Sequence, residues 1–314
     1  MMDLVFCGTP PFAVPTLQRL FSAGFHVRLV VTQPDRPSGR GMEFAASPIK
    51  RDALQLDLPL TQPDNIKNNE EFRAQLETIR PQAIVVVGYG RIIPQWMIEL
   101  PPLGNINLHA SLLPKYRGAA PIQWAIASGE SITGVTTMRI DAGLDTGDIL
   151  EQREEPIRGD DTALTLAPRL AHTGAELVIT SLAGLLKAGI TPRPQDNDLA
   201  TLAPILTKED GLIDFSHTAK ETWNRLRGFQ PWPGAFTRFR GKLLHIHQAL
   251  PAAEIAVVAA GHFAIENERL LLGFAHGSAL EIHELQMEGK KRMSGRDFIN
   301  GYRPTHEEPV GATA

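Results

Sequence analysis

The sequence predicts an α/β protein with a Rossmann-like, mostly parallel sheet in its N-terminal part and a small C-terminal β-barrel. Short apolar runs alternate with helical patterns through the first half, which is typical of a parallel sheet covered by helices. Residues 189–204 carry three prolines and several polar side chains, which indicates a linker. Beyond residue 206, short alternating segments at close spacing favour a barrel. Because 314 residues suffice for two domains, we expect domains at 1–188 and 206–314, joined by a linker at 189–205.

The N-terminal domain is expected to begin with a strand at 4–7, followed by the turn Gly8-Thr9-Pro10-Pro11 and a helix at 13–23. Gly24 ends that helix, because glycine readily adopts the left-handed conformation that commonly closes helices. Residues 33–41 are too rich in proline and glycine for regular structure, and long loops in compact domains are often functional. The other expected elements are strands at 26–32, 83–87, 104–108, 133–140 and 149–153, and helices at 121–127 and 164–186.

The C-terminal domain is expected to combine one helix with several short strands. A helical pattern covers 218–226, and the turn residues Pro233-Gly234 follow it. The strands that we expect in this domain are 235–239, 243–247, 268–274 and 279–285.

Composition excludes several classes of protein. A single cysteine rules out an internal disulfide, so a secreted, disulfide-stapled fold is unsupported. The sequence shows neither a signal-peptide pattern nor a long apolar run, and we expect a cytoplasmic protein without membrane contact. The G-x-G-x-x-G and P-loop motifs are both absent, so dinucleotide binding has no support.

The net charge of −4 argues by itself against a nucleic-acid-binding protein, but the basic residues are unevenly distributed. Six of them lie between Lys220 and Lys242 against one acid, and a second cluster lies at 290–296. On charge alone, a solvated surface with local ion pairs is favoured. The distribution of basic residues allows a phosphate-binding face but does not by itself indicate one.

Asn107 and His109 lie two residues apart at the carboxyl end of an expected strand, so both side chains point to the same face. In open α/β sheets, ligands bind beyond the carboxyl ends of the strands. An amide that donates to a developing oxyanion, beside an imidazole that handles protons, suits acyl transfer. The alternative is that Asn107 caps a turn and His109 is a structural histidine. Without a third partner, this structural interpretation is slightly favoured.

A third partner could lie in the turn Asp141-Ala142-Gly143-Leu144-Asp145-Thr146-Gly147-Asp148. Its three acids do not fit the EF-hand pattern of calcium-binding loops. The turn could simply be a solvated connection between strands. Alternatively Asp145, at a strand end, could orient His109, fix its tautomer and raise its basicity.

A set of spaced residues resembles the active site of folate-dependent formyltransferases: Asn107-x-His109-x-Ser111-Leu112-Leu113-Pro114-x-x-x-Gly118, followed by Asp145 in a Leu-Asp-x-Gly turn. The resemblance implies 10-formyltetrahydrofolate as cosubstrate, no metal, and a catalytic trio of Asn107, His109 and Asp145. By the same resemblance, the folate-binding residues are Ser111, Leu112, Leu113 and Pro114, with the loop Tyr89-Gly90-Arg91-Ile92-Ile93 as a wall of the pterin pocket.

This superfamily includes enzymes that formylate glycinamide ribonucleotide, nucleotide-linked sugars and methionyl-tRNA, and the rest of the chain is similar to the last of these. The loop from Thr32 to Gly41 is similar to one that such enzymes use against the acceptor stem, although Met42-Glu43 replaces a common pair of lysines. Segments 227–237 and 288–293 resemble their C-terminal OB-like domain, whose basic face follows tRNA phosphates. The resemblance thus implies methionyl initiator tRNA as the partner, with these tRNA-binding residues: Arg36, Arg40, Arg225, Arg227, Lys290, Lys291 and Arg292.

Two alternatives stay open at this point. A nucleotide-sugar N-formyltransferase would share the catalytic residues and the folate donor, but it would use another second domain. A tRNA- or folate-binding module without catalysis is disfavoured by the complete trio of polar residues. We expect a monomer in which 1–188 is the catalytic domain and 206–314 binds tRNA.

Overall fold

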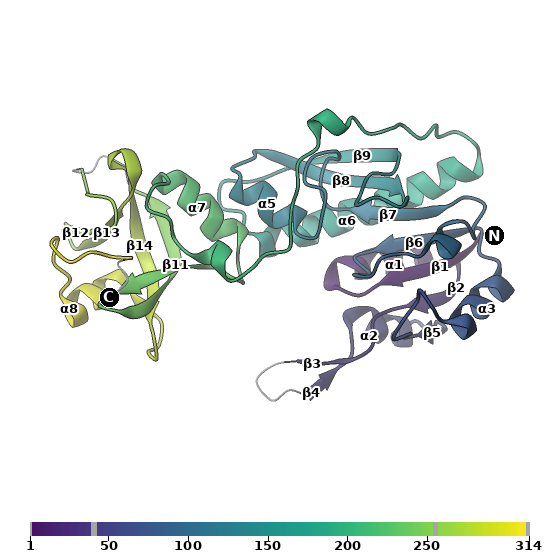
Figure 1. The fold of residues 1–314 in the computed structure, drawn as a ribbon, viewed down its shortest axis with the longest axis horizontal. Coiled ribbons are helices and arrows are strands. Elements are labelled where there is room, and N and C mark those ends of the chain that lie inside the picture. The colour runs from purple at the N-terminus through teal and green to yellow at the C-terminus, as the bar shows by residue number, and fades with distance from the viewer. Residues whose placement is uncertain (1, 39–42, 254–256, 312–314) are drawn as a thin grey trace. The chain divides into compact units, whose positions relative to one another are not determined.

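The structure, a computed structural model, describes residues 2–38, 43–253 and 257–311, and the chain divides into two compact units (Figure 1). The first unit comprises Met1–Ala119, Ile132–Pro156 and Ala167–Ala203, and the second comprises Ala120–Ser131, Ile157–Leu166 and Pro204–Ala314. Two short segments of the predicted domain at 1–188 therefore belong to the second unit. These boundaries differ from the predicted domains at 1–188 and 206–314, which stay a prediction. Within the described ranges, no helix is both long and apolar enough to cross a membrane.

The first unit contains a seven-stranded sheet in which every strand except β8 runs in the same direction, which confirms the predicted fold class. From β1 the chain adds β2 and β5 on one side of the sheet and then β6 and β7 on the other. Ligands of open α/β sheets bind at such a reversal, beyond the carboxyl ends of the strands. The strands in spatial order are β5 (Leu60–Thr61), β2 (His26–Val31), β1 (Asp3–Gly8), β6 (Ala83–Val87), β7 (Asn105–His109), β8 (Ile132–Arg139) and β9 (Ile149–Pro156).

Helices cover both faces of this sheet. α6 (Ala163–Leu186) packs on one face, where the hydroxyls of Ser181 and Thr137 are hydrogen-bonded at 2.7 Å. α3 (Glu70–Ile79) packs on the other face, where Phe72 joins Val86 of β6 in a buried core. The remaining helical elements of the unit are η1 (Pro11–Ala13), α1 (Val14–Ser22), α2 (Pro48–Gln55), α4 (Gln95–Ile98) and η2 (Asn197–Leu199).

One expectation for the first unit is wrong. The loop after β2, predicted to lack regular structure, contains a two-stranded antiparallel sheet of β3 (Arg36–Ser38) and β4 (Glu43–Ala45). Proline is tolerated in a strand at a sheet edge, and both strands of a pair are edges, so Pro37 does not prevent this hairpin. The predicted tRNA contact Arg40 lies at 39–42, outside the described residues.

The second unit contains the predicted small barrel. Its antiparallel strands lie in the order β10 (Ala235–Phe239), β11 (Lys242–Pro251), β14 (Ala279–Met287), β13 (Arg269–Gly273) and β12 (Phe263–Glu266), with β15 (Met293–Ser294) on β14. The C-terminal segment closes the two edges, because Val310 bridges to Phe239 of β10 and Pro309 bridges to His262, next to β12. Phe298 of α8 (Gly295–Tyr302) fills the core with the inward side chains of the strands. Two short helical turns, η3 (Glu209–Gly211) and η4 (Ala275–Gly277), complete the unit.

Helix α5 (Pro121–Ala127) belongs to the second unit because it packs closely on α7 (Ala219–Gly228). Gly228 marks the closest approach: an added Cβ would lie 2.5 Å from the Gln123 carbonyl oxygen and 2.9 Å from the Ala127 nitrogen. Beside it, the rings of Trp124 and Phe229 meet edge-on with 5.2 Å between centroids. The absence of a side chain at position 228 is therefore what allows the two helices to approach.

In Gly228→Ala, the new methyl group has to displace backbone atoms of α5, so we expect a loss of about 1–3 kcal/mol in unfolding free energy. Gly301→Ala in α8 is the matched control, because nothing lies within 4 Å of its Cβ position. Alanine in that exposed helix is expected to stabilise by about 0.5–1 kcal/mol. Urea unfolding followed by circular dichroism measures both, and equal stabilities would contradict the close contact.

Candidate active site

Strand β7 presents Asn107 and His109 on one face of the sheet, with β8 beside it. The cross-strand partners of these two residues in β8 are Met138 and Thr136, which face the same side. The His109 side chain is buried, and that of Asn107 is half-buried. Among the residues that the structure describes, the Asn107 amide has no hydrogen-bond partner, so its donors are free for a ligand.

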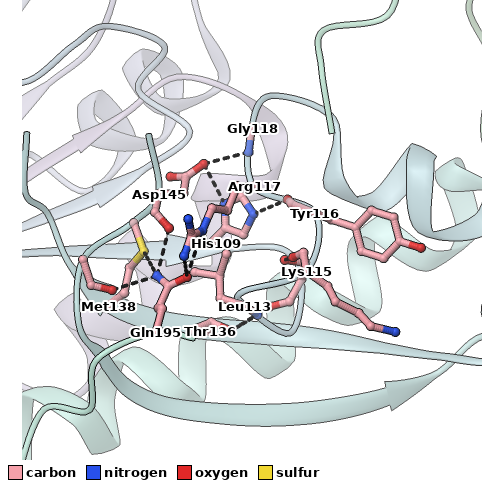
Figure 2. Close-up of polar contacts among 12 residues, drawn as sticks. His109, Leu113, Lys115, Tyr116, Arg117, Gly118, Thr136, Met138, Asp145 and Gln195 are labelled. Carbon is pink, nitrogen blue, oxygen red and sulfur yellow. Dashed lines mark hydrogen bonds and ion pairs between the residues drawn. The ribbon is translucent and has the colours of Figure 1, made fainter. Parts of the chain in front are cut away.

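The His109 ring lies between two oxygen atoms (Figure 2). Its Nε2 is 2.9 Å from the carbonyl oxygen of Tyr116, which can only accept, so Nε2 carries a hydrogen. Its Nδ1 is 3.6 Å from Oδ2 of Asp145, which is an ion-pair distance once the ring is protonated. The Tyr116 carbonyl thus orients the ring and fixes its tautomer, a role that the sequence suggested for Asp145. The Asp145 carboxylate instead lies on the Nδ1 side of the ring.

The Asp145 carboxylate is held by backbone. Its Oδ2 accepts a hydrogen bond from the N–H of Gly118 at 2.9 Å, and Asp145 itself has a left-handed φ of 52°. Gly118 has a φ of 126°, and an added Cβ would lie 2.5 Å from the carbonyl oxygen of Ala203. Only glycine fits there, which explains its place at the end of the predicted motif. The structure therefore brings His109 and Asp145 together, with Asn107 on the face of β7 that carries His109.

Two residues that the sequence did not single out hold the Asp145 loop (Figure 2). The Gln195 amide donates from Nε2 to the carbonyls of Asp145 and Gly147, both at 2.8 Å. Its Oε1 accepts from Nε and Nη2 of Arg117, at 3.0 and 2.8 Å. Arg117 is only 7% exposed. Nothing in the composition around Gln195, which lies in the predicted linker, marks it as part of a site.

The loop of residues 111–114, which the resemblance assigns to folate, directly follows β7 and is tied to β8 and β9. The hydroxyl of Thr136 donates to the Ser111 carbonyl at 2.7 Å and accepts from the Leu113 N–H at 3.1 Å. Gln152 donates to the Leu113 carbonyl at 2.8 Å. These hydrogen bonds fix the loop that directly follows His109 in the chain.

The loop after β6 divides the other predicted folate residues between core and surface. The side chains of Tyr89 and Ile93 are buried, and Tyr89 belongs to the core of the sheet. Its backbone carbonyl accepts from Gln33 at 2.8 Å. Arg91 donates to a backbone carbonyl, whereas Ile92 is 92% exposed. A ligand at this loop would therefore meet the backbone around Gly90 and the Ile92 side chain, not the Tyr89 ring.

The basic residues predicted to bind tRNA are partly exposed and partly buried. Arg36 in β3 and the three residues at 290–292, between β14 and β15, are exposed. Of these, Arg292 pairs with Glu284 at 3.5 Å. The exposed positions leave their charges accessible to a phosphate.

Arg225 and Arg227 in α7 are used inside the second unit. Arg227 is 8% exposed, donates to the Asp161 carbonyl at 2.8 Å, and lies over the Trp223 ring, 4.0 Å from its centroid. Burial lowers the pKa of its guanidinium. Arg225 is half-buried and donates to the Asp210 carbonyl at 3.0 Å. In this structure Arg227 serves the interior of the unit and is not placed to meet a phosphate.

Comparison with known proteins defines the class. Residues 2–182 match the formyl transferase family, and residues 205–303 match the formyl transferase C-terminal domain. The fold is shared with the sugar 3N-formyl transferase WlaRD (TM-score 0.67, 21% identity, 93% of this chain and 99% of that chain). It is also shared with an N-formyltransferase from Helicobacter canadensis (TM-score 0.68, 21% identity, 91% and 100%). Fold and site thus define a formyl transferase.

Closer relatives identify the branch. The methionyl-tRNA formyltransferase of Koribacter versatilis is 66% identical over 310 residues, which cover 99% of both chains. That of Acidobacterium capsulatum is 58% identical over 311 residues, covering 99% of this chain and 100% of the relative. The chain belongs to the methionyl-tRNA formyltransferase family, which confirms the resemblance found in the sequence. The alternative of a nucleotide-sugar N-formyltransferase has support only from fold, because those structures are 21% identical.

Arg227→Ala leaves the Asp161 carbonyl without its charged donor, and we expect a loss of roughly 2–4 kcal/mol in unfolding free energy. Lys291→Ala, at an exposed position, is the control and should stay within about 0.5 kcal/mol of the parent. Thermal and urea unfolding measure both. A stable Arg227→Ala protein with weakened tRNA binding would instead give Arg227 a direct role at the nucleic acid.

Proposed function

We propose that the chain transfers the formyl group of 10-formyltetrahydrofolate to the free α-amine of methionyl initiator tRNA. The observation that carries this proposal is the His109–Asp145 contact at 3.6 Å, with Asn107 on the same face of β7 and its amide without a hydrogen-bond partner among the described residues. The full-length similarity to methionyl-tRNA formyltransferases supports the choice of acceptor. We also propose that the protein acts as a cytoplasmic monomer and needs no metal.

The reaction exchanges one bond for another. The amine nitrogen forms a bond to the formyl carbon, and the bond from that carbon to N10 of the folate breaks. One proton leaves the amine and one is taken up by N10, so the step needs no oxidant or reductant. The formyl oxygen becomes negative on the way, and Asn107 donates a hydrogen bond to it. One such donor lowers a barrier by about 3 kcal/mol.

His109 and Asp145 together manage the proton. Because Nε2 holds its hydrogen on the Tyr116 carbonyl, the ring accepts the amine proton at Nδ1. The carboxylate of Asp145 then faces a cation at 3.6 Å and stabilises it until the proton passes to N10. Each group keeps its place through the step, so no large rearrangement of the site is required.

The residues present fit the folate. The loops after β6 and β7 both leave the carboxyl edge of the sheet, where open α/β folds bind ligands. Gly90 is exposed, and the Asn107 amide, which has no hydrogen-bond partner in the described part of the chain, lies on the face of β7 that carries His109. We assign residues 111–114 and 89–93 to holding the pterin end of the folate.

Removing one member of the trio is expected to slow turnover far more than it weakens folate binding. For Asn107→Ala we expect a fall in kcat of about 10²–10³-fold, because the oxyanion loses its donor. For His109→Ala and Asp145→Asn we expect at least about 10²-fold, because proton transfer loses its acceptor or that acceptor's counter-charge. Formyl transfer to charged tRNA gives kcat, and folate titration gives affinity.

Asp141→Asn is the control for Asp145→Asn, because it makes the same change in the same loop at an exposed position that we place outside the site. Its kcat should stay within about twofold of the parent value, since the amide oxygen of the new side chain can still accept the hydrogen bonds that Asp141 Oδ1 receives from Gly143 and Thr146. Near-normal turnover in all three trio variants would refute the assignment.

We further propose that the exposed basic residues of both units contact tRNA phosphates. Arg36 lies on the hairpin of β3 and β4, and the exposed turn at 290–292 joins β14 to β15. Arg40, which the resemblance also assigns to tRNA, lies outside the described residues. Phosphate contacts from separate segments give affinity without reading bases.

The double variant Lys290→Ala/Lys291→Ala is expected to raise KM for charged tRNA and to flatten its salt dependence. Each lost phosphate contact should reduce the slope of log(kcat/KM) against log salt by about 1. Arg36→Ala and Arg40→Ala should act in the same direction. Arg73→Ala, an exposed cation of α3 paired with Glu77, is the control. A salt dependence equal to the parent's in all variants would remove these contacts from the proposal.

A further inference from the structure

Residues 193–203 run along both loops that build the active site, and we name this segment the strap. At its start, Arg193 exchanges two backbone hydrogen bonds with Ile149 of β9, at 2.8 and 2.9 Å. Near its end, Leu202 forms a parallel bridge with Arg117. The strap lies within the first unit, although the sequence predicts a linker there.

The strap fixes the peptide that orients His109. The carbonyl of Tyr116, which receives the His109 hydrogen, shares a rigid peptide plane with the N–H of Arg117. That N–H donates to the Thr201 carbonyl at 2.8 Å, and the Tyr116 N–H donates to the Thr201 hydroxyl at 2.8 Å. A plane held on one side by Thr201 therefore presents its oxygen to the imidazole on the other.

The strap also holds Asp145 where the strand connection alone would not bring it. β8 runs antiparallel to β7 and ends at Arg139, opposite Ile106 and three residues short of His109. The loop after β8 must therefore turn back by about 10 Å to bring Asp145 to the ring. Gln195 of the strap donates to the carbonyls of Asp145 and Gly147 on this returning loop, both at 2.8 Å.

Arg117 joins the two contacts. Its guanidinium donates to Oε1 of Gln195 at 3.0 and 2.8 Å and to Oδ1 of Asn197 at 2.9 Å, while its own peptide lies next to Tyr116. Both strap side chains therefore depend on a residue of the loop that orients His109. A buried cation with amide oxygens on its donors is a rigid support.

We propose that the strap positions the catalytic pair, with Gln195 as the positioning residue that sets Asp145 against His109. The proposal rests on the proposed function, since it assigns Gln195 a role through Asp145 and not through substrate. Displacement of a reacting group by about 1 Å can slow an enzyme by about 10²-fold. A purely structural contact would instead change stability and leave turnover per folded molecule intact.

The first test compares Gln195→Ala with Gln82→Ala in the full-length protein. Gln82 is also a half-buried glutamine bonded to backbone, accepting from the Asp3 N–H at 3.1 Å, but it lies at the amino end of β6. For Gln195→Ala we expect kcat to fall roughly 10- to 100-fold, with KM for folate and charged tRNA within about twofold. For Gln82→Ala we expect the kcat of the parent protein and a change in melting temperature similar to that of Gln195→Ala.

The second test separates stability from positioning. Gln195→Glu keeps an oxygen for Arg117 and adds an ion pair, but it has no hydrogen for the two carbonyls. For Gln195→Glu we expect a melting temperature at or above that of Gln195→Ala. We expect its kcat to be no higher than that of Gln195→Ala. If turnover instead recovered with stability, Gln195 would be a structural residue only and the inference would be wrong.

A double variant identifies the path of the effect. If Gln195 acts through Asp145, adding Gln195→Ala to Asp145→Asn should change kcat by less than about twofold. Independent losses that multiply would overturn the inference. Absence of formyl transfer to charged tRNA by the parent protein would refute the proposed function, and parent-like turnover in Asp145→Asn would refute the role of Asp145. Parent-like turnover in Gln195→Ala alone would refute the strap proposal and leave the proposed function intact.

Discussion

The contact between the His109 imidazole and the Asp145 carboxylate requires a particular path of the loops at the ends of β7 and β8 in the first unit. The two side chains come from segments that leave neighbouring strands in opposite directions, because β7 and β8 are antiparallel. A distance of 3.6 Å between Nδ1 and Oδ2 therefore needs the loop after β8 to fold back over the sheet and stay there. The N–H of Gly118 and the amide of Gln195 supply the hydrogen bonds that hold it.

The proposed chemistry depends on the placement of three polar groups. In the proposed mechanism, formyl transfer between two nitrogens moves one proton and develops one oxyanion, and an amide, an imidazole and a carboxylate serve these needs. Each of these groups is common in proteins, and its contribution to the reaction rate depends on its being fixed in place before the substrates bind. Each of Thr136, Gln152 and Gln195 donates a hydrogen bond to a backbone carbonyl of an active-site loop, namely those of Ser111, Leu113 and Asp145 in turn. They immobilise the loops without competing for the reacting side chains.

The sequence predicted most of this fold because local signals agree with the final structure. Buried runs such as 83–87 and 235–239 became β6 and β10 with the predicted bounds. Helices α2 and α3 were not predicted from the sequence, although it contains their N-cap residues, Ser47 and Asn69, whose side chains accept backbone hydrogen bonds. The strap and the return of the Asp145 loop could not be predicted, because both follow from strand direction, which no local pattern encodes.

The basic residues also show that local sequence patterns do not reveal which side chains the fold buries. The resemblance placed Arg225 and Arg227 with Lys290 and Lys291 as tRNA-binding residues, yet the Arg227 guanidinium is buried against Trp223 and backbone carbonyls. Arg117, which carries no signal in charge counting, is equally buried and supports the active site. What separates these arginines from the exposed turn at 290–292 is the fate of their donors. A guanidinium whose hydrogens already meet carbonyl or amide oxygens has few left for a phosphate, so the tRNA-binding surface must be sought among the cations that the fold leaves exposed.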